Sequence, residues 1–486
     1  MSALMVMGTG SDVGKSLIVA GLCRAFKNRG LTVRPFKPQN MSNNAAVTIE
    51  GGEIGRAQAL QAMACGVKPS VDMNPLLLKP ETDIGSQVIV GGKRVATMTA
   101  REFFKNRAQF MPQILESFER LQHEADLVLV EGAGSPAEAN LREADLANMG
   151  FAEAANLPVI LVGDIHRGGV IASIIGTQAV LSEKDANRIK AFLINNFHGD
   201  PSLFNEGLRI IEEKTGWPSL GVVPHFDQAK NLPAEDALAL DKTTRGKGAI
   251  KIAVPRLSRI ANFDDLDPLT VDDNVAVIFV QPGEPLPGDA DLILLPGSKS
   301  TIADMKFFIS QGWDIDLAAH IRRGGRVLGL CGGYQMLGRT IHDPQAIEGP
   351  ACSIEGLGFL DVETTLLGEK SLKNVSAQHC ASGTELSGYE MHLGETTGCD
   401  CGAPFSMVDR RNEGATARGG QIAGTYLHGL FASDDFRQNF LKGLGHEVGP
   451  TSYQGLIEET LDNLAHHLEN HVALDRLLDA AKGVSS

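Results

Sequence analysis

A short apolar segment, a glycine-rich turn and the tripeptide Gly14-Lys15-Ser16 constrain the fold of this chain more than any other feature. Residues Leu4–Met7 are apolar, residues Gly8–Ser16 form the turn, and a helix-length stretch runs over Gly14–Arg29. A strand, a glycine turn and a helix in this order present backbone N–H groups and a helix N-terminus to a phosphate group. The pattern therefore predicts that the chain opens with a nucleotide-binding strand-turn-helix unit.

Four residues of this turn are candidates for the nucleotide site: Gly10, Gly14, Lys15 and Ser16. We expect Lys15 to reach the β- and γ-phosphate oxygens of ATP and Ser16 to hold Mg²⁺. The strict phosphate-loop pattern has glycine six residues before the lysine, but here Thr9 occupies that position and Gly8 comes one step earlier. An ordinary tight turn is the alternative interpretation. The joint occurrence of all the parts favours ATP and Mg²⁺ as cofactors.

Further apolar runs alternate with helix-length stretches, which is typical of doubly wound parallel sheets. In the first half the predicted strands cover 33–36, 127–130, 158–162, 192–195 and 220–223, and the predicted helices include 101–123 and 170–182. The alternation resumes with strands at 251–254, 275–280, 292–295 and 326–330. We therefore expect two α/β domains, 1–226 and 250–447, joined by a polar linker at 227–249. An amphipathic helix with Ile457, Leu461, Leu464 and Leu468 marks a C-terminal helical tail at 448–486.

Polar residues follow three strands that are predicted to lie near the phosphate loop. Glu131 ends the strand at 127–130, where a second Mg²⁺ ligand belongs, although a structural carboxylate is the alternative. Asp164 and Arg167 follow the strand at 158–162, and with Lys37 and Asn40 they are candidates for the acceptor site. Lys37 and Asn40 follow the strand at 33–36, and a lysine followed by amide side chains suits an anionic acceptor that becomes an amide. A polar turn is the alternative interpretation of that segment.

The second half carries a candidate nucleophile, Cys331. It lies between small residues where the strand at 326–330 meets a helix, so the glycines permit a strained turn and the helix N-terminus favours the thiolate. His428, in the segment Gly424–Gly429, is the candidate base. Backbone N–H groups near Gly297 and Gly332 are candidates for part of an oxyanion hole. A buried, inert cysteine is the alternative.

Composition excludes some classes of function. The chain has 486 residues, a net charge of −15 and only 5% aromatic residues, which point away from binding to nucleic acid or to an anionic membrane. No apolar run approaches the roughly 18 residues that cross a bilayer, and the segment Met1–Met7 reads as a strand and not a signal peptide. Seven cysteines without framework spacing indicate reduced thiols and a cytoplasmic location. The C-terminal helix suits internal packing or a homo-oligomer.

Together these motifs resemble known families. The cysteine turn, the loop at Pro296–Ser298 and His428 resemble a triad-type, class I glutamine amidotransferase domain of flavodoxin-like fold. The first half resembles the dethiobiotin-synthetase-like phosphate-loop fold. With the further segments Phe36–Asn44, Asp164–Gly169 and Gly388–His392, nearly the whole chain resembles the cobyric acid synthase family. The segment Lys37–Asn44 is the most family-specific of these.

The resemblance implies a carbon–nitrogen ligase of cobalamin biosynthesis with L-glutamine and a corrinoid acceptor as partners. It implies amidation of adenosylcobyrinic acid a,c-diamide at its b, d, e and g carboxylates. ATP would convert each carboxylate to an acyl phosphate, with Lys15 and Lys37 neutralising phosphate charge, and Cys331 would release ammonia from glutamine. Arg142, Arg167 and Lys37 suit a polyanionic acceptor in an otherwise acidic protein.

One departure concerns the amidotransferase triad. That pattern has glutamate two residues after the histidine, and here the position is Leu430. A dyad, or an acid or carbonyl from elsewhere in the chain, must then orient His428. Without a local acid, we expect His428 to act chiefly as the proton carrier to the leaving ammonia.

Two alternatives stay open at this point. The first keeps the enzyme class and changes the acceptor: a cobyrinate a,c-diamide synthase or another glutamine-dependent amidoligase. The second is a partition-type or regulatory phosphate-loop ATPase with a degenerate amidotransferase domain. The segment Lys37–Asn44 argues against the first, and the presence of both Cys331 and His428 argues against the second.

Overall fold

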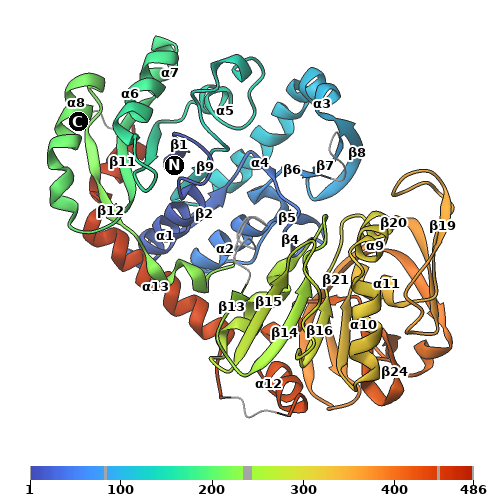
Figure 1. Cartoon of the computed structure of the whole chain (residues 1–486). Coiled ribbons are helices and arrows are strands. Elements are labelled where there is room, and N and C mark those ends of the chain that lie inside the picture. Colours follow the sequence, from blue (N-terminus) through green and yellow to red (C-terminus); the bar gives the residue numbers. More distant parts are fainter. Residues whose placement is uncertain (1, 81–84, 234–243, 446–448, 484–486) are drawn as a thin grey trace. The chain divides into compact units, whose positions relative to one another are not determined.

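The computed structural model describes residues 2–80, 85–233, 244–445 and 449–483 (Figure 1). Its contacts divide the chain into unit 1, with Met1–Ser42, Thr48–Pro233 and Leu456–Ser486, and unit 2, with Asn43–Val47 and Ala234–Gly455. Part of the predicted linker at 227–249 and the predicted boundary at 447/448 lie outside the described residues. The predicted domain boundaries therefore stay predictions.

Unit 1 contains a six-stranded parallel sheet with the order β12-β11-β10-β1-β9-β2. Its strands are β1 (Ser2–Gly8), β2 (Val33–Phe36), β9 (Leu127–Glu131), β10 (Val159–Asp164), β11 (Ile189–Phe197) and β12 (Ser219–Pro224). Every neighbouring pair is parallel, so the carboxyl ends of all six strands lie at one edge. The strands predicted for this half are confirmed, and β1 lies between β9 and β10.

The helices in the first 233 residues of unit 1 follow the predicted alternation with one exception. They are α1 (Lys15–Asn28), α2 (Arg56–Ala64), α3 (Ala100–Asn106), α4 (Met111–Glu124), α5 (Met149–Ala154), α6 (Val170–Val180), α7 (Glu183–Ala186) and α8 (Asn205–Thr215). The prediction of one helix over 101–123 is wrong, because a 3-10 turn at Arg107–Phe110 separates α3 from α4. Pro112, in the first turn of α4, has no N–H to donate, so an α-helix cannot continue through it without a break.

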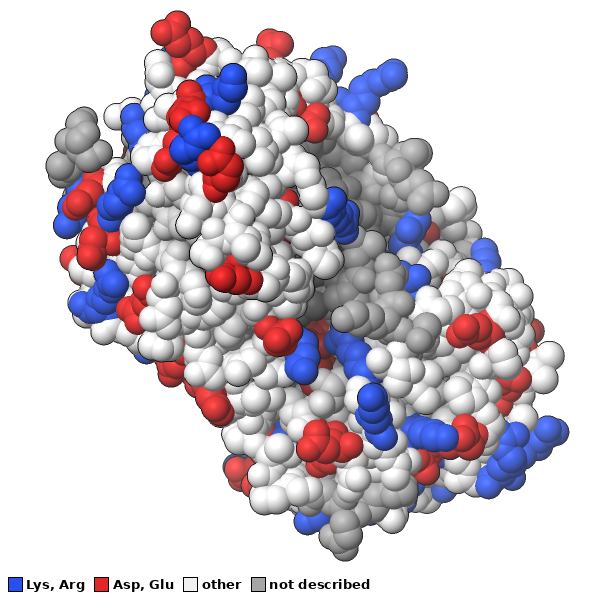
Figure 2. All heavy atoms as spheres, turned by 60° about the vertical axis from the view of Figure 1, so that its left-hand side comes forward, with Lys and Arg blue, Asp and Glu red and all other residues white. Residues whose placement is uncertain are grey.

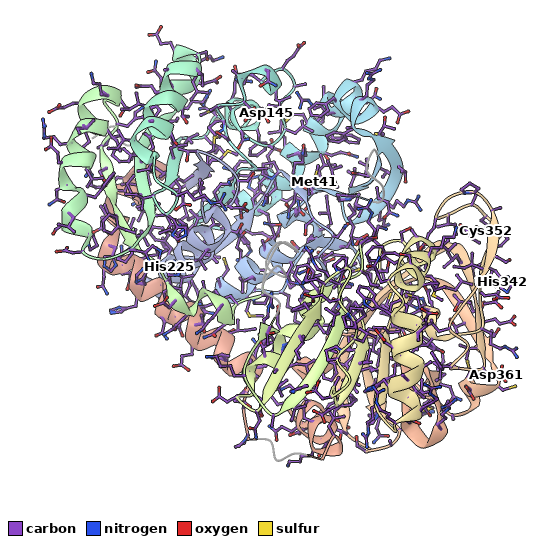
Figure 3. The ribbon with its side chains drawn as sticks, in the orientation of Figure 1. Met41, Asp145, His225, His342, Cys352 and Asp361 are labelled. Carbon is purple, nitrogen blue, oxygen red and sulfur yellow. The ribbon has the colours of Figure 1, made fainter. Side chains whose placement is uncertain are left out.

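A small sheet that the sequence pattern did not predict follows β2. It has the order β3-β6-β7-β8, with β3 (Gln39–Met41), β6 (Leu76–Pro80), β7 (Gly85–Val90) and β8 (Lys93–Thr99). Two further short strands, β4 (Ala45–Val47) and β5 (Glu53–Gly55), lie in the same stretch of sequence. Side chains alternate along β3, so Asn40 is buried while Met41, labelled in Figure 3, is 56% exposed. The alternation turns Asn40 toward the interior of unit 1.

The C-terminal helices α13 (Tyr453–His471) and α14 (Leu474–Ala481) belong largely to unit 1. A Cβ atom at Gly21 of α1 would lie 2.5 Å from Cδ1 of Leu468, so α13 packs closely on the helix that follows the phosphate loop. Buried Arg24 of α1 donates to Glu458 at 2.5 Å. The apolar face of this predicted tail therefore packs inside the chain, and a homo-oligomer stays a prediction.

Unit 2 contains a second mainly parallel sheet with the order β13-β15-β14-β16-β17-β25-β24. Its strands are β13 (Thr244–Arg245), β14 (Ile250–Pro255), β15 (Val275–Val280), β16 (Leu292–Leu295), β17 (Arg326–Leu330), β24 (Ala415–Ala417) and β25 (Ile422–Thr425). Its helices are α9 (Thr301–Ser310), α10 (Trp313–Arg322), α11 (Gly332–Leu337) and α12 (Asp434–Gly443). The predicted α/β class is confirmed, and the four predicted strands of this half are present.

A long, mainly antiparallel sheet in unit 2 goes beyond the doubly wound prediction. It comprises β18 (Thr340–Asp343), β19 (Cys352–Glu355), β20 (Val362–His379), β21 (Glu385–Gly398), β22 (Ser406–Val408), β23 (Arg411–Glu413) and β26 (Leu427–His428). Tyr389 of β21 is in register with His428 of β26. The added sheet thus forms one side of the region around the candidate base.

The face of the molecule in Figure 2 carries Lys and Arg side chains interspersed with Asp and Glu side chains.

Within the described ranges, no helix combines the length and the apolar character needed to cross a membrane.

Candidate active sites

The phosphate loop of unit 1 runs from the end of β1 into α1. A Cβ atom at Gly8 would lie 2.4 Å from Cγ2 of Val13 and 3.0 Å from Nζ of Lys15, so a side chain has no room there. Gly14 has φ +87° and lies close to Asn195, whose Nδ2 donates to the carbonyl oxygen of Val13 at 2.9 Å. Gly8, which stands one position earlier than the strict phosphate-loop pattern requires, thus lets the backbone pass close to Lys15.

Lys15 joins two loops at the carboxyl edge of the sheet. Its Nζ donates to the carbonyl oxygens of Gly10 at 2.8 Å and Gly134 at 3.1 Å, which belong to the loops after β1 and β9. The residue is 7% exposed. An ammonium group at this edge of the sheet, beside the phosphate loop, suits the approach of phosphate oxygens.

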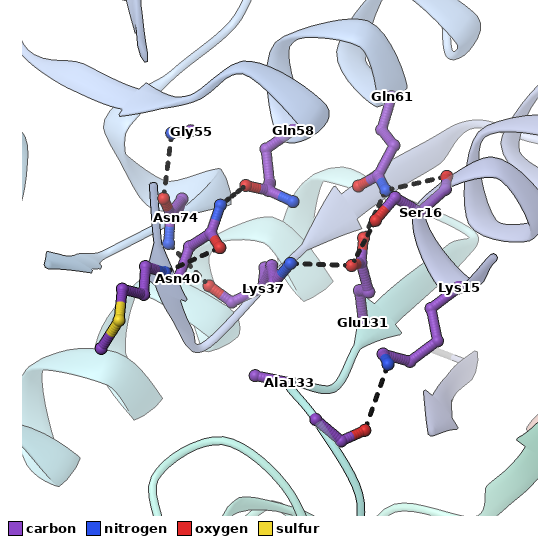
Figure 4. Close-up of polar contacts among 12 residues, drawn as sticks. Lys15, Ser16, Lys37, Asn40, Gly55, Gln58, Gln61, Asn74, Glu131 and Ala133 are labelled. Atoms are coloured by element: carbon purple, nitrogen blue, oxygen red, sulfur yellow. Dashed lines mark hydrogen bonds and ion pairs between the residues drawn. The ribbon is translucent and has the colours of Figure 1, made fainter. Parts of the chain in front are cut away.

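Glu131, at the end of β9, accepts hydrogen bonds from three side chains (Figure 4). Oε1 accepts from Ser16 Oγ and from Lys37 Nζ, each at 2.8 Å. Oε2 accepts from Gln61 Nε2 of α2 at 2.6 Å. Because this carboxylate is buried, the Lys37 ammonium and the neutral donors are what hold its charge in place. The structure therefore brings Ser16, Lys37 and Glu131 together, as their positions at neighbouring strand ends led us to expect.

The donor set beside the loop fits Mg²⁺. A serine hydroxyl and a carboxylate oxygen are hard ligands, and Mg²⁺ in nucleotide sites is held by one or two such groups together with phosphate oxygens and water. Ser16 and Glu131 would hold the ion, in place of their mutual hydrogen bond. Over the described ranges, no group of three or more His, Cys, Asp or Glu residues forms a separate metal site.

A network of amides continues from Lys37 into α2 (Figure 4). Asn40 Nδ2 donates to Gln58 Oε1 at 2.9 Å. Asn74 Nδ2 donates to the carbonyl oxygen of Lys37 at 3.1 Å, and its Oδ1 accepts from the N–H of Gly55 at 3.0 Å. These amides fix the loop after β2 against the start of α2. Asn40 is thus a supporting contact of the site in this structure.

The sequence interpretation missed Gln58, Gln61 and Asn74. The two glutamines stand three positions apart in a helix whose other residues are mainly alanine. Amides on the buried face of such a helix are unusual, because a buried amide needs partners. Two glutamines on one face of a buried helix are therefore the sequence pattern that could have identified Gln58 and Gln61 as site residues.

Asp164 ends β10, the other neighbour of β1, and Arg167 follows it, at the sheet edge where they were predicted. Asp164 Oδ1 accepts from the N–H of His166 at 2.9 Å, and Arg167 is exposed. Among the described residues, no recorded hydrogen bond or ion pair joins either of them to Lys37 or Glu131. Their roles toward an acceptor stay predictions.

Arg142 is committed to an internal ion-pair cluster. It lies 2.8 Å from Asp185 and 2.5 Å from Glu153. The hydrogen bond to Asp185 and then that to Glu153 raise the pKa of Arg142 above its ordinary value, against the effect of burial. Its charge is already balanced, so it suits acceptor binding less well than the sequence suggested.

Cys331 of unit 2 lies in a strained turn between β17 and α11. Its φ of 51° and ψ of −107° are unusual for a residue with a side chain, and its N–H donates to the carbonyl oxygen of Thr425 at 2.8 Å. The residue is 9% exposed. This is the geometry that the sequence predicted for a nucleophile at the end of a strand.

Gly297 and Gly332 lie beside this turn. A Cβ atom at Gly332 would come within 2.9 Å of the backbone N of Ser298. A Cβ atom at Gly297 would lie 2.9 Å from the carbonyl oxygen of Ala261 and 3.5 Å from Cε1 of His428. The loop after β16 therefore approaches the cysteine turn and the histidine together, as an oxyanion site requires.

His428 is oriented by Asp265, which no sequence argument identified. The Nδ1–H of His428 donates to Asp265 Oδ2 at 2.6 Å, and the N–H of Gly429 donates to Asp265 Oδ1 at 2.6 Å. Asp265 lies in the 3-10 helix Phe263–Val271, 163 positions before the histidine. The ring of Tyr389 stacks on the imidazole with centroids 5.2 Å apart. The sequence left open a dyad, or an acid or carbonyl from elsewhere in the chain. The structure shows a distant acid, Asp265, in the role that the residue at position 430 has in the family pattern.

The surroundings of His428 favour its protonated form. Burial acts to lower the pKa, but the charge of Asp265, its hydrogen bond and the hydrogen bond with Cys331 outweigh burial and raise the pKa of His428 to about 10. We expected His428 to act chiefly as a proton carrier because no acid stood near it in the sequence. Asp265 supplies that acid, so the expectation no longer has this support and stays a prediction.

Comparisons with known proteins assign a family to each half of the chain. Residues 4–239 match the family described as "CobQ/CobB/MinD/ParA nucleotide binding domain", and residues 251–436 match the "CobB/CobQ-like glutamine amidotransferase domain". Among solved structures, that of PurLQS from Thermotoga maritima matches 44% of this chain and 98% of that chain, with 15% identity and a TM-score of 0.29.

Full-length relatives are also found. A protein from Cereibacter sphaeroides described as cobyric acid synthase is 59% identical over 482 residues, which cover 99% of this chain and 100% of that protein. Another protein with this description, from Methylobacterium nodulans, is 59% identical over 484 residues and 99% of each chain.

Proposed function

The chain belongs to the cobyric acid synthase family, and from that premise we propose that it amidates adenosylcobyrinic acid a,c-diamide at its b, d, e and g carboxylates. The nitrogen comes from L-glutamine and the energy from ATP. The first site activates the acceptor, and the second releases ammonia.

Activation is needed because a carboxylate has no good leaving group. Transfer of the γ-phosphoryl group of ATP to a carboxylate oxygen gives an acyl phosphate, from which phosphate leaves readily. Lys15 is placed to bind the phosphate oxygens, and Lys37 can move from Glu131 to the negative charge that builds up during transfer. Mg²⁺ held by Ser16 and Glu131 would neutralise phosphate charge.

Ammonia release begins at Cys331. The thiolate attacks the side-chain amide of glutamine, and a proton from His428 leaves with the ammonia. The N–H groups near Gly297 and Gly332 stabilise the oxyanion of the tetrahedral intermediate. Water then hydrolyses the thioester, with His428 as the base.

The observation that carries the proposal is the contact between Asp265 and His428 beside Cys331. Asp265 is the third member of a Cys331–His428–Asp265 triad, in which it orients the histidine for glutamine hydrolysis. It also argues against an ATPase with a degenerate amidotransferase domain, because such a domain would have no need to keep a buried acid–imidazole pair.

A panel of acceptors tests the proposal. The purified full-length chain is given ATP, Mg²⁺ and glutamine with either cobyrinic acid a,c-diamide or cobyrinic acid, and products are identified by mass spectrometry. We expect successive amidation of the a,c-diamide. Amidation that stops when cobyrinic acid has gained its a and c amides would instead assign a cobyrinate a,c-diamide synthase, and no corrinoid product would overturn the acceptor class.

A further inference from the structure

Two glutamine side chains of α2 lie beside the acceptor-activating site, and the steps above use neither. Gln58 and Gln61 are three positions apart, so they project from the same face of the helix. Both are fully buried. Figure 4 shows the two amides extending from α2 toward Lys37 and Glu131.

Each amide uses one of its two ends. Asn40 Oδ1 accepts from the N–H of Met41 at 2.8 Å, so Asn40 presents Nδ2 to Gln58, whose Oε1 accepts at 2.9 Å. Glu131 is a carboxylate that only accepts, so Gln61 must present its Nε2, at 2.6 Å. The partners therefore fix the orientation of both amides.

The opposite ends are unused. Within the described part of the chain, Gln58 Nε2 and Gln61 Oε1 are buried without a hydrogen-bond partner. A buried donor and a buried acceptor without partners cost stability, which a bound group can recover. One helix face thus offers a ligand one N–H donor and one oxygen acceptor.

The backbone holds this face rigidly. A Cβ atom at Gly55 would lie 2.2 Å from Nδ2 of Asn40 and 2.7 Å from Oε1 of Gln58, so only glycine permits this packing. The N–H of Gly55 is held by Asn74, which also binds the backbone of Lys37. Donors that are fixed in advance cost no reorganisation when charge develops on the reacting group.

We propose that Gln58 and Gln61 bind the tetrahedral intermediate formed when ammonia attacks the acyl phosphate, with Gln58 Nε2 donating to its oxyanion and Gln61 Oε1 accepting from its ammonium group. The inference rests on the proposed function, because it requires an acyl phosphate. A neutral donor–acceptor pair matches this intermediate, which carries an O⁻ and an N–H⁺ group on one carbon, better than it matches a carboxylate with two acceptor oxygens.

The step balances without another reactant. The lone pair of ammonia forms the C–N bond, and the carbonyl π pair moves to oxygen. Collapse of the intermediate re-forms C=O and breaks the bond to the phosphate oxygen, which takes the electron pair. The nitrogen loses one proton to the departing phosphate, leaving a primary amide and inorganic phosphate.

The sharpest variant is Gln58→Glu, because it keeps Oε1 for Asn40 and replaces only the NH₂ group by oxygen. The full-length chain is assayed with ammonia as the nitrogen source and cobyrinic acid a,c-diamide as the acceptor. Phosphorylation is followed separately, without any nitrogen source, by positional isotope exchange in labelled ATP. We expect kcat for amidation to fall about 100-fold, the effect of removing one oxyanion donor, while isotope exchange stays within about threefold of wild type.

Two further variants test whether the effect comes from loss of the donor and not from the added charge. Gln58→Met removes the donor without placing a charge in the interior, and it should also lower amidation more than isotope exchange. Gln178→Glu is the matched control, because Gln178 of α6 instead donates its Nε2–H to the carbonyl oxygen of Thr215 at the end of α8. The control should leave both rates unchanged.

The outcomes separate the two levels of inference. Amidation by both Gln58 variants within about threefold of wild type overturns the oxyanion role. An equal loss of isotope exchange and amidation also overturns it, because the side chain would then serve ATP or metal geometry. Absence of acceptor-dependent isotope exchange in the wild type would instead reject the acyl phosphate and the inference that rests on it, and absence of any amidated corrinoid would reject the proposed function.

Discussion

The sites of unit 1 and unit 2 are assembled in different ways. In unit 1, Ser16, Lys37 and Glu131 follow β1, β2 and β9, which are neighbours in one parallel sheet, so their meeting follows from the strand order. In unit 2, His428 meets Asp265 from a 3-10 helix 163 positions earlier. The first site is specified by a general rule of sheet architecture, and the second depends on a particular packing of distant segments.

The largest expected effect tests whether the two sites divide the labour. Cys331→Ser should lower glutamine-dependent amidation by about 10⁶-fold, because the thiolate is the nucleophile, and leave ammonia-dependent amidation within about twofold. Both rates are measured on the full-length chain. Cys380→Ser, at an exposed cysteine of the same unit, is the matched control and should change neither rate. Equal loss of both activities in a folded Cys331 variant would refute the division.

The second prediction concerns Asp265. Asp265→Asn should lower glutaminase turnover by about 10⁴-fold, because an amide cannot hold the imidazolium as a carboxylate does. Asp267→Asn, in the same 3-10 helix, is the control, since Asp267 pairs with Arg245 instead. A glutaminase rate that is equal in the two variants would remove Asp265 from the catalytic group.

The same variant has a pH signature. Asp265 helps to raise the pKa of His428 to about 10. Without the carboxylate charge the imidazolium is less favoured, so His428 should lose its proton at lower pH. The pH at which the imidazole of His428 titrates, followed by NMR, should therefore be lower in Asp265→Asn than in wild type. An unchanged titration would show that Asp265 has only a structural role.

Sequence patterns predicted the part of the molecule that follows local rules. Apolar runs located β1, β2, β9 and β10, and the strand-end rule located Glu131 correctly beside the phosphate loop. The family resemblance is also confirmed over the full chain. The exception among helices is the break between α3 and α4, where a proline effect was overlooked.

The remaining contacts have no local pattern. Asp265 stands among other aspartates in 263–271, and nothing in that segment distinguishes the residue that reaches His428. The register of β21 with β26 decides where His428 lies, and register across a long antiparallel sheet is a tertiary property. Gln61 could have been predicted as a site residue from the sequence, because an amide on a buried helix face needs a hydrogen-bond partner.

The third prediction returns to unit 1. Lys15→Met should lower amidation by about 10³-fold with either nitrogen source, because the charge that binds the transferred phosphoryl group is lost. Glutaminase turnover should persist, since Cys331 and His428 are untouched. Retained ammonia-dependent amidation would reject the phosphate-binding role of Lys15.

The smallest expected effect is the shift in Mg²⁺ requirement of Glu131→Gln. The glutamine keeps one oxygen toward Ser16 or Lys37 but loses the charge that attracts the ion, so the Mg²⁺ concentration for half-maximal amidation should rise about 10- to 100-fold, with a smaller change at saturating Mg²⁺. Glu153→Gln, at another carboxylate of unit 1 that pairs with cations, should leave the titration unchanged. An unchanged titration in Glu131→Gln would make Glu131 a structural anchor for Lys37. The strand-end rule would then have placed a carboxylate correctly beside the phosphate loop without identifying a metal ligand.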